Sequence, residues 1–112
     1  MILYRPVGAK ELDLIKGNDY RSFPPRLPEQ PIFYPVLTQD YAEEIAAWNL
    51  KDPASGYKGY ILQFEIDDNY IKSYQTHEAG GKSRLEYWIP ADELELFNQH
   101  IIGQIVLIKE LR

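Results

Sequence analysis

Five of the chain's eight prolines lie in one stretch of fourteen residues, FPPRLPEQPIFYPV, which runs from Phe23 to Val36. Proline lacks a backbone N–H and fixes φ, so neither a helix interior nor a central strand can be built across this stretch. Residues 18–35 also show neither the helical nor the strand period. The sequence therefore predicts a long ordered loop in the first third of the chain, here called the proline loop.

The proline loop has more than one interpretation. Pro25, Pro28 and Pro31 are spaced by three, which places them on one face of a polyproline II helix, the form that SH3-type domains bind. No basic residue stands at the usual flanking offset, and in a compact domain such a run packs on its own body. Prolines also restrict a loop before it binds, so the loop either forms a pre-ordered wall of a binding site or only holds a crossover in place.

Regular elements are expected on both sides of the proline loop. The expected strands are residues 2–5, 57–66, 71–76, 84–89 and 104–111, the expected helices are residues 9–16, 38–50 and 90–101, and turns are expected at 67–69 and 80–81. Strands and helices are mixed without a strict βαβ rhythm, which favours the α+β class. The length of 112 residues fits one domain, residues 1–112.

Periodicity gives these elements their faces. Thr38 is a capping residue for the second helix, whose apolar stripe comprises Tyr41, Ala42, Ile45, Ala46 and Trp48. In the strand that follows, Tyr60, Leu62, Phe64 and Ile66 share one face. The last strand is apolar on both faces, which is typical of an internal strand.

Composition excludes several classes of function. The net charge of −5 disfavours non-specific binding to nucleic acid or to anionic membranes. The chain has no cysteine, and its two histidines, His77 and His100, lie outside any metal-ligand spacing, so no metal is expected. No signal-peptide core or membrane-length apolar run occurs, so we expect a soluble cytoplasmic protein.

The motifs of serine hydrolases, P-loop NTPases and Rossmann dinucleotide-binding proteins are absent. The candidates that remain are Arg5, the aromatic pair Phe33 and Tyr34, and Glu86. Each also has a purely structural interpretation. Arg5 would pair with a surface carboxylate, Tyr34 would belong to the core, and Glu86 would face outward from a strand.

The segments LYRPVG, FPPR, FYPVLTQDYAEEIAAW, GYKGYILQFEI and EYWIPADELELFNQHIIGQI together resemble a family of small bacterial proteins whose label joins ADP-ribosylation with crystallin. The resemblance covers nearly the whole chain. The order of parts also resembles the ADP-ribosyltransferase fold: an opening strand ending in Arg, an FY segment feeding an Ala-rich helix that ends in Trp, and a late strand with Glu. This fold implies a mixed or antiparallel sheet with about three short helices.

The resemblance implies roles for particular residues, with NAD as the substrate. Arg5 would bind NAD, Tyr34 would contact the nicotinamide with Phe33 as its neighbour, and Glu86 would hold a ribose hydroxyl during glycosidic cleavage. Arginine-modifying relatives carry an acid two positions before the catalytic Glu, where this chain has Arg84. Modification of protein arginine is therefore disfavoured, and Arg84 is expected to receive a phosphate-bearing ligand instead.

A Ser-Thr-Ser strand found in one branch of that fold is also missing; only Ser73 and Thr76 lie near the expected region. The resulting hypothesis is binding of NAD or an ADP-ribose-bearing nucleotide between the proline loop and the Glu86 strand, with ADP-ribosyl transfer or NAD hydrolysis as the reaction. The alternative is a non-catalytic module that binds a protein partner through tyrosines and the proline loop. Whether the protein is an enzyme stays open at this point.

Overall fold

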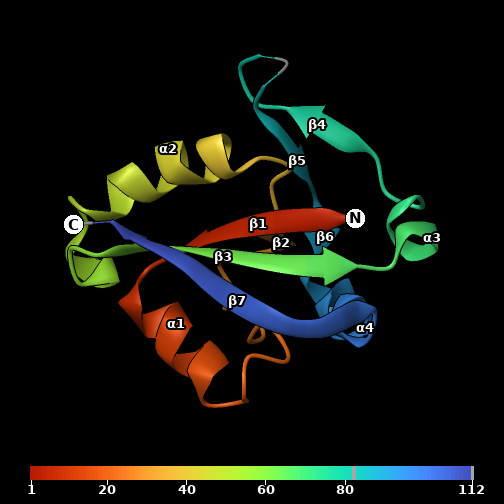
Figure 1. Cartoon of the computed structure of the whole chain (residues 1–112), viewed down its shortest axis with the longest axis horizontal. Coiled ribbons are helices and arrows are strands. Elements are labelled where there is room, and N and C mark those ends of the chain that lie inside the picture. Colours follow the sequence, from red (N-terminus) through yellow and green to blue (C-terminus); the bar gives the residue numbers. More distant parts are fainter. Residues whose placement is uncertain (82, 112) are drawn as a thin grey trace.

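Strands and helices are mixed along the chain in the computed structural model, which describes residues 1–81 and 83–111 (Figure 1). The elements are β1 (Ile2–Val7), α1 (Ala9–Lys16), β2 (Ile32–Phe33), α2 (Gln39–Asn49), β3 (Gly59–Ile66), α3 (Asp68–Ile71), β4 (Thr76–Glu78), β5 (Leu85–Tyr87), β6 (Ile89–Pro90), α4 (Leu94–Gln99) and β7 (Ile101–Leu111), with 3₁₀ turns at Pro53–Ser55 and Ala91–Glu93. The predicted α+β class is confirmed. The radius of gyration, 13.2 Å, is that of a single domain of this length.

The main sheet has the order β1-β3-β7, and both of its pairings are antiparallel. The alternation read from the sequence of β3 is confirmed, because Tyr60, Leu62, Phe64 and Ile66 are all buried. Ile61 points to the opposite face and is also fully buried. The central strand is therefore covered on both sides.

Helix α2 covers one face of this sheet, and α1 and α4 lie on the other side (Figure 1). Under α2, a small cluster gathers around Val36, Ala42, Ala46 and Ile61. The other face carries the main core, in which the rings of Phe23, Phe33, Phe64 and Phe97 contact one another at centroid distances of 4.8–6.0 Å. In the part of the chain that the structure describes, no helix has the length and apolar character needed to span a bilayer.

The capping chemistry of α2 is confirmed, but one residue of its predicted stripe is wrong. The Thr38 hydroxyl accepts a hydrogen bond from the Tyr41 N–H at 3.1 Å. Trp48, in contrast, is 73% exposed. The buried stripe centres on Ala42 and Ala46, and Trp48 lies about 140° round the helix from the middle of that pair, so it projects away from the sheet.

The region after β3 also differs from the prediction. Asp67 accepts a hydrogen bond from the Asn69 N–H at 3.2 Å and starts a helix, α3, in place of the turn expected at 67–69. This helix ends at Ile71, where the expected strand over 71–76 was to begin. The next strand, β4, begins only at Thr76. The predicted hairpin around Gly80 and Gly81 is confirmed, since β4 pairs antiparallel with β5 and both glycines have positive φ.

The last strand was predicted to be internal, which is wrong: β7 is an edge of the main sheet. Register shifts in its pairing with β3 break the simple alternation, so Ile105 is buried while Val106 and Leu107 are exposed. The preceding helix ends at Gln99 rather than near residue 101. Gly103, expected to stop the helix, lies inside β7 with φ of 74°.

The proline loop is ordered, as predicted, and contains only the two-residue strand β2. A turn closed by the Gln30 N–H on the Leu27 carbonyl, at 2.8 Å, includes Pro28. This turn separates Pro25 from Pro31, so the three prolines do not share one polyproline II helix. The loop packs on the body through Phe23 and Phe33, both buried.

Candidate functional site

One short backbone segment brings the candidate residues together. Val36 exchanges two hydrogen bonds with Tyr4 of β1, at 2.9 and 2.8 Å, and forms a bridge with Glu86 of β5 on its other side. Arg5 follows Tyr4 and Tyr34 lies two residues before Val36, so three segments distant in sequence meet at one row. The site is therefore positioned by the backbone pairing of Tyr4, Val36 and Glu86, and not by any single side-chain contact.

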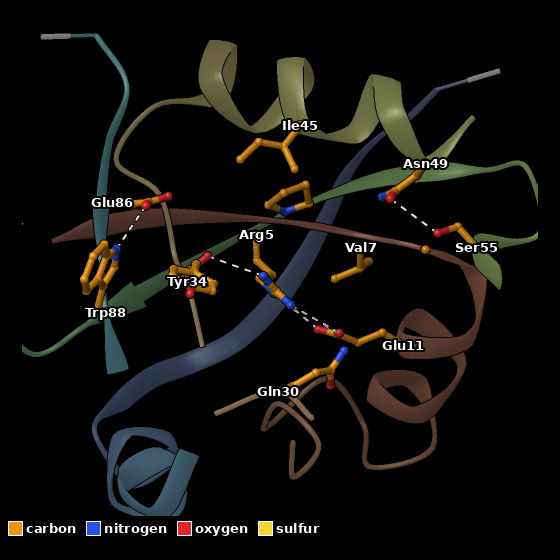
Figure 2. A pocket seen from close by; sticks show the side chains of 12 residues that line it. Arg5, Val7, Glu11, Gln30, Tyr34, Ile45, Asn49, Ser55, Glu86 and Trp88 are labelled. Atoms are coloured by element: carbon orange, nitrogen blue, oxygen red, sulfur yellow. Dashed lines mark hydrogen bonds and ion pairs between the residues drawn. The ribbon is translucent and has the colours of Figure 1, made fainter. Parts of the chain in front are cut away.

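Arg5, Tyr34 and Glu86 line one cavity of about 500 Å³, together with Trp88. Figure 2 shows Arg5 between two groups, with Glu86 and Trp88 on one side and Glu11 on the other. The remaining lining residues are Pro6, Val7, Gly8, Glu11, Gln30, Ile45, Asn49 and Ser55. A cavity of this volume is in the range of small-molecule sites.

Both oxygens of the Glu86 carboxylate are held. The Tyr41 hydroxyl donates to Oε2 at 3.2 Å, and the Trp88 indole N–H donates to Oε1 at 3.0 Å. Burial, and then the neighbouring Glu86 charge, raise the pKa of Tyr41, so this phenol stays protonated and donates. Each carboxylate oxygen can accept a second hydrogen bond, which leaves Glu86 able to bind a ligand hydroxyl.

Arg5 pairs with Glu11 of α1 rather than with a surface carboxylate. Its Nε and Nη2 lie 3.3 Å from Oε2 and Oε1 of Glu11, and its Nη1 donates to the Tyr34 carbonyl at 3.4 Å. The guanidinium also lies over the Phe33 ring, 4.9 Å from its centroid. Arg5 is thus oriented from three sides before any ligand arrives.

Arg26 of the proline loop joins the same group. Its Nη1 lies 3.3 Å from Oε1 of Glu11, and its guanidinium lies 5.2 Å from the Phe33 centroid. Burial alone raises the pKa of Glu11, but the attraction of Arg5 and Arg26 outweighs it, and the pKa lies below its ordinary value. We call Arg5, Glu11 and Arg26 the arginine triad.

Tyr34 and Trp88 form an aromatic corner beside Glu86. Their rings meet edge to face with centroids 6.2 Å apart, and Tyr34 is 40% exposed, so it is not a core residue. On its other side Trp88 stacks on His77 at 3.8 Å. A flat ligand ring could pack on the exposed faces of this corner.

Two residues expected at the site lie elsewhere. Phe33 is fully buried and is not among the lining residues; it packs beneath the guanidiniums of Arg5 and Arg26. Arg84 also lies outside the cavity lining, where its Nη2 donates to Glu44 at 2.5 Å. The turn that precedes β5 directs Arg84 toward α2, so the structure does not bring it to the cavity.

The sequence reasoning missed Glu11, Arg26 and Trp88. Trp88 had a signal, because it stands two positions after Glu86, and alternate residues of an extended chain share a face. Arg26 also had a signal, because it is a basic residue within the proline-rich stretch. Nothing in the pattern of α1 marks Glu11, whose importance comes only from packing against the proline loop.

The chain was compared with known families, curated proteins and solved structures. No family model, no curated protein and no solved structure matches the chain. The resemblance to the ADP-ribosylation/crystallin family and to the ADP-ribosyltransferase fold therefore stays a prediction. Across residues 1–81 and 83–111, no three His, Asp or Glu side chains are grouped as metal ligands.

Proposed function

We propose that the protein binds NAD or another ADP-ribose-bearing nucleotide in the cavity between the proline loop and β5. One observation carries the proposal: Arg5, Tyr34 and Glu86, which come from three distant segments, line the same cavity. These are the residues to which the ADP-ribosyltransferase resemblance assigns ligand contacts. The other two residues that the resemblance assigns to the ligand, Phe33 and Arg84, lie outside the cavity lining.

The chemistry of each residue suits such a ligand. The Arg5 guanidinium offers a fork of N–H donors to phosphate or ribose oxygens. The electron-rich faces of Tyr34 and Trp88 attract a cationic nicotinamide ring. Glu86, with acceptor capacity left on both oxygens, would take a ribose hydroxyl.

With NAD bound, Glu86 would assist cleavage of the bond between the nicotinamide nitrogen and ribose C1′. The bonding electron pair goes to nicotinamide, which leaves as a neutral molecule, and positive charge develops on the ribose. The nearby carboxylate stabilises that charge, as in glycoside hydrolysis. Water or an acceptor hydroxyl then bonds to C1′ and loses its proton, which gives NAD hydrolysis or ADP-ribosyl transfer, respectively.

Calorimetric titration with NAD tests the proposal, with Arg5→Ala as the variant and Arg84→Ala as the matched control outside the cavity. We expect saturable binding by the unmodified chain and by Arg84→Ala. We expect affinity at least about tenfold weaker for Arg5→Ala, because a charge-assisted contact to the ligand is lost. Absence of binding at millimolar NAD, or equal affinity in all three proteins, would remove Arg5 and the nucleotide from this cavity.

Exposed aromatics favour a second candidate, a non-catalytic protein-binding module. Trp48 and Tyr57 are 73% and 60% exposed, and Leu27 of the proline loop is 53% exposed. Large aromatic side chains are enriched where proteins contact one another. A stoichiometric partner whose binding is lost in Trp48→Ala, together with no response to nucleotides, would favour this candidate over the first.

A further inference from the structure

The arginine triad places two positive charges around a single negative charge. Arg5 and Arg26 both lie 3.3 Å from the Glu11 carboxylate. The side chains of Arg5, Glu11 and Arg26 are 16%, 20% and 4% exposed. Among the described residues, no second carboxylate pairs with either arginine, so one positive charge of a largely buried group is left without a counterion.

Arg26 is the least satisfied member of this group. Its Nη1 contacts Glu11 and its Nη2 donates to the Pro24 carbonyl at 3.2 Å. Its Nε is buried and has no hydrogen-bond partner within the described part of the chain. Buried charges in proteins are normally paired and fully hydrogen-bonded, because desolvating an unpaired ion is costly. The triad therefore carries one more positive than negative charge, and one of its guanidinium N–H groups has no acceptor among the described residues.

The triad also lies beside two cavities that share part of their lining. A second cavity of about 480 Å³ is lined by Arg26 and Lys10, whereas Arg5 lines only the first. Glu11 and Gln30 line both cavities. A ligand that extends from Tyr34 and Glu86 past Glu11 would thus meet a second guanidinium and a lysine.

We infer that Arg26 and Lys10, together with Arg5, form a phosphate-binding site beside the lining that the two cavities share. The bound group is the pyrophosphate of the nucleotide, and in this respect the inference rests on the proposed function. Its oxyanion neutralises the second positive charge of the triad and accepts from guanidinium N–H groups that Glu11 leaves unused. The opposing charge in the second cavity, Asp52, is engaged locally, since its carboxylate accepts from the Ala54 N–H and the Ser55 hydroxyl.

A purely structural triad makes the opposite prediction for Glu11. If Glu11 acts mainly by holding the two arginines in place, removing its charge loosens them, which weakens any binding of an anion to them. If the triad binds an anion, Glu11 competes with that anion, and removing its charge strengthens binding. The sign of the Glu11→Gln effect on affinity therefore distinguishes the two interpretations.

The test is titration of the full chain with inorganic pyrophosphate at low ionic strength, in the absence of NAD. We expect saturable binding that is weakened about tenfold or more in Arg26→Gln, because a guanidinium fork to phosphate is lost. We expect binding about tenfold tighter in Glu11→Gln, because a competing negative charge is removed. Arg84→Gln, whose side chain lies outside both cavities, serves as the control and should bind like the unmodified chain.

No pyrophosphate binding, or an affinity that is the same in Arg26→Gln and Arg84→Gln, would overturn the inference. Weaker binding in Glu11→Gln would do so as well. Should Arg26→Gln fail to fold, the Nε–H resonance of Arg26 in the unmodified chain decides, because bound pyrophosphate must shift it. Pyrophosphate binding without NAD binding would support the phosphate site and refute the proposed function. NAD binding without pyrophosphate binding would support the proposed function and refute the phosphate site.

Discussion

At the scale of single residues, the Glu86 carboxylate is the group best prepared for chemistry. Tyr41 and Trp88 each donate one hydrogen bond to it, which fixes its orientation toward the cavity. A pre-oriented carboxylate stabilises charge as it develops, without rearranging during the reaction. A glutamine at this position would have nearly the same shape but no charge.

Glu86→Gln should therefore keep NAD binding while NAD consumption falls by about two orders of magnitude or more. Binding is measured by calorimetry and consumption by release of nicotinamide. Glu65→Gln, which changes an exposed carboxylate on β3, is the control and should leave both unchanged. Equal NAD consumption by the Glu86→Gln and unmodified proteins would refute the catalytic role.

Glu11 gives a second residue-scale prediction, on the pH dependence of stability. Its pKa is lower in the folded chain, where the attraction of Arg5 and Arg26 exceeds the effect of burial. A carboxyl with a lowered pKa in the folded state contributes stability that is fully present above its unfolded pKa, about 4.3, and is lost as the pH falls through the folded value. Glu11→Gln should thus lower the free energy of unfolding by about 2 kcal/mol at pH 7, because hydrogen bonds to two charged groups are lost.

That difference between Glu11→Gln and the unmodified chain should shrink as the pH drops below about 4. Urea denaturation at a series of pH values measures it. A difference that stays constant from neutral pH down to strongly acid conditions would mean that the Glu11 charge does not stabilise the fold.

At the scale of elements, the packing of α2 on β3 determines where the cavity lies. Gly59 at the start of β3 approaches α2 so closely that an added Cβ would lie 2.7 Å from the Ala46 carbonyl oxygen. That oxygen is backbone, so it cannot swing aside as a flexible side chain could. Ile45 and Asn49 of the same helix line the cavity, so a shift of α2 would also change the site.

Gly59→Ala should consequently destabilise the chain by about 1–3 kcal/mol, because the helix must move away from the sheet. Gly17→Ala is the matched control: Gly17 has a right-handed backbone with φ of −64°, and an added Cβ would meet its nearest neighbour at an ordinary 3.4 Å. Thermal or urea denaturation compares the two. A Gly59→Ala chain as stable as Gly17→Ala would show that α2 has room to accept a Cβ at Gly59 and is not tightly packed on β3.

At the scale of the whole molecule, local chemistry was readable from the sequence and long-range register was not. The Thr38 cap, the alternation of β3 and the hairpin at Gly80 and Gly81 depend on neighbouring residues, and all three were predicted correctly. The edge position of β7 depends on which strands pair, and apolar residues on both of its faces wrongly indicated an internal strand. Irregular register with β3 exposes part of that apolar surface instead.

The candidate site shows the same division. Arg5, Tyr34 and Glu86 were singled out by residue type and by resemblance, and the row through Val36 brings them to one cavity. The ion pair between Glu11 and Arg26 joins α1 to a loop that has no periodicity. No local sequence pattern therefore predicts this pair. The structure relates the prolines of the loop to the site, because the segment that they stiffen positions Arg26 in the triad and Tyr34 in the cavity lining.

The central claim is that one nucleotide site is formed where β1, the proline loop and β5 meet. The most direct measurement is a series of ¹H–¹⁵N correlation spectra of the full chain during titration with NAD. We predict saturable shifts of the Arg5, Tyr34 and Glu86 amides and of the Trp88 indole N–H, with the amides of β7 unmoved. No shift at millimolar NAD, or shifts confined to β7 and other surfaces away from the cavity, would contradict the claim.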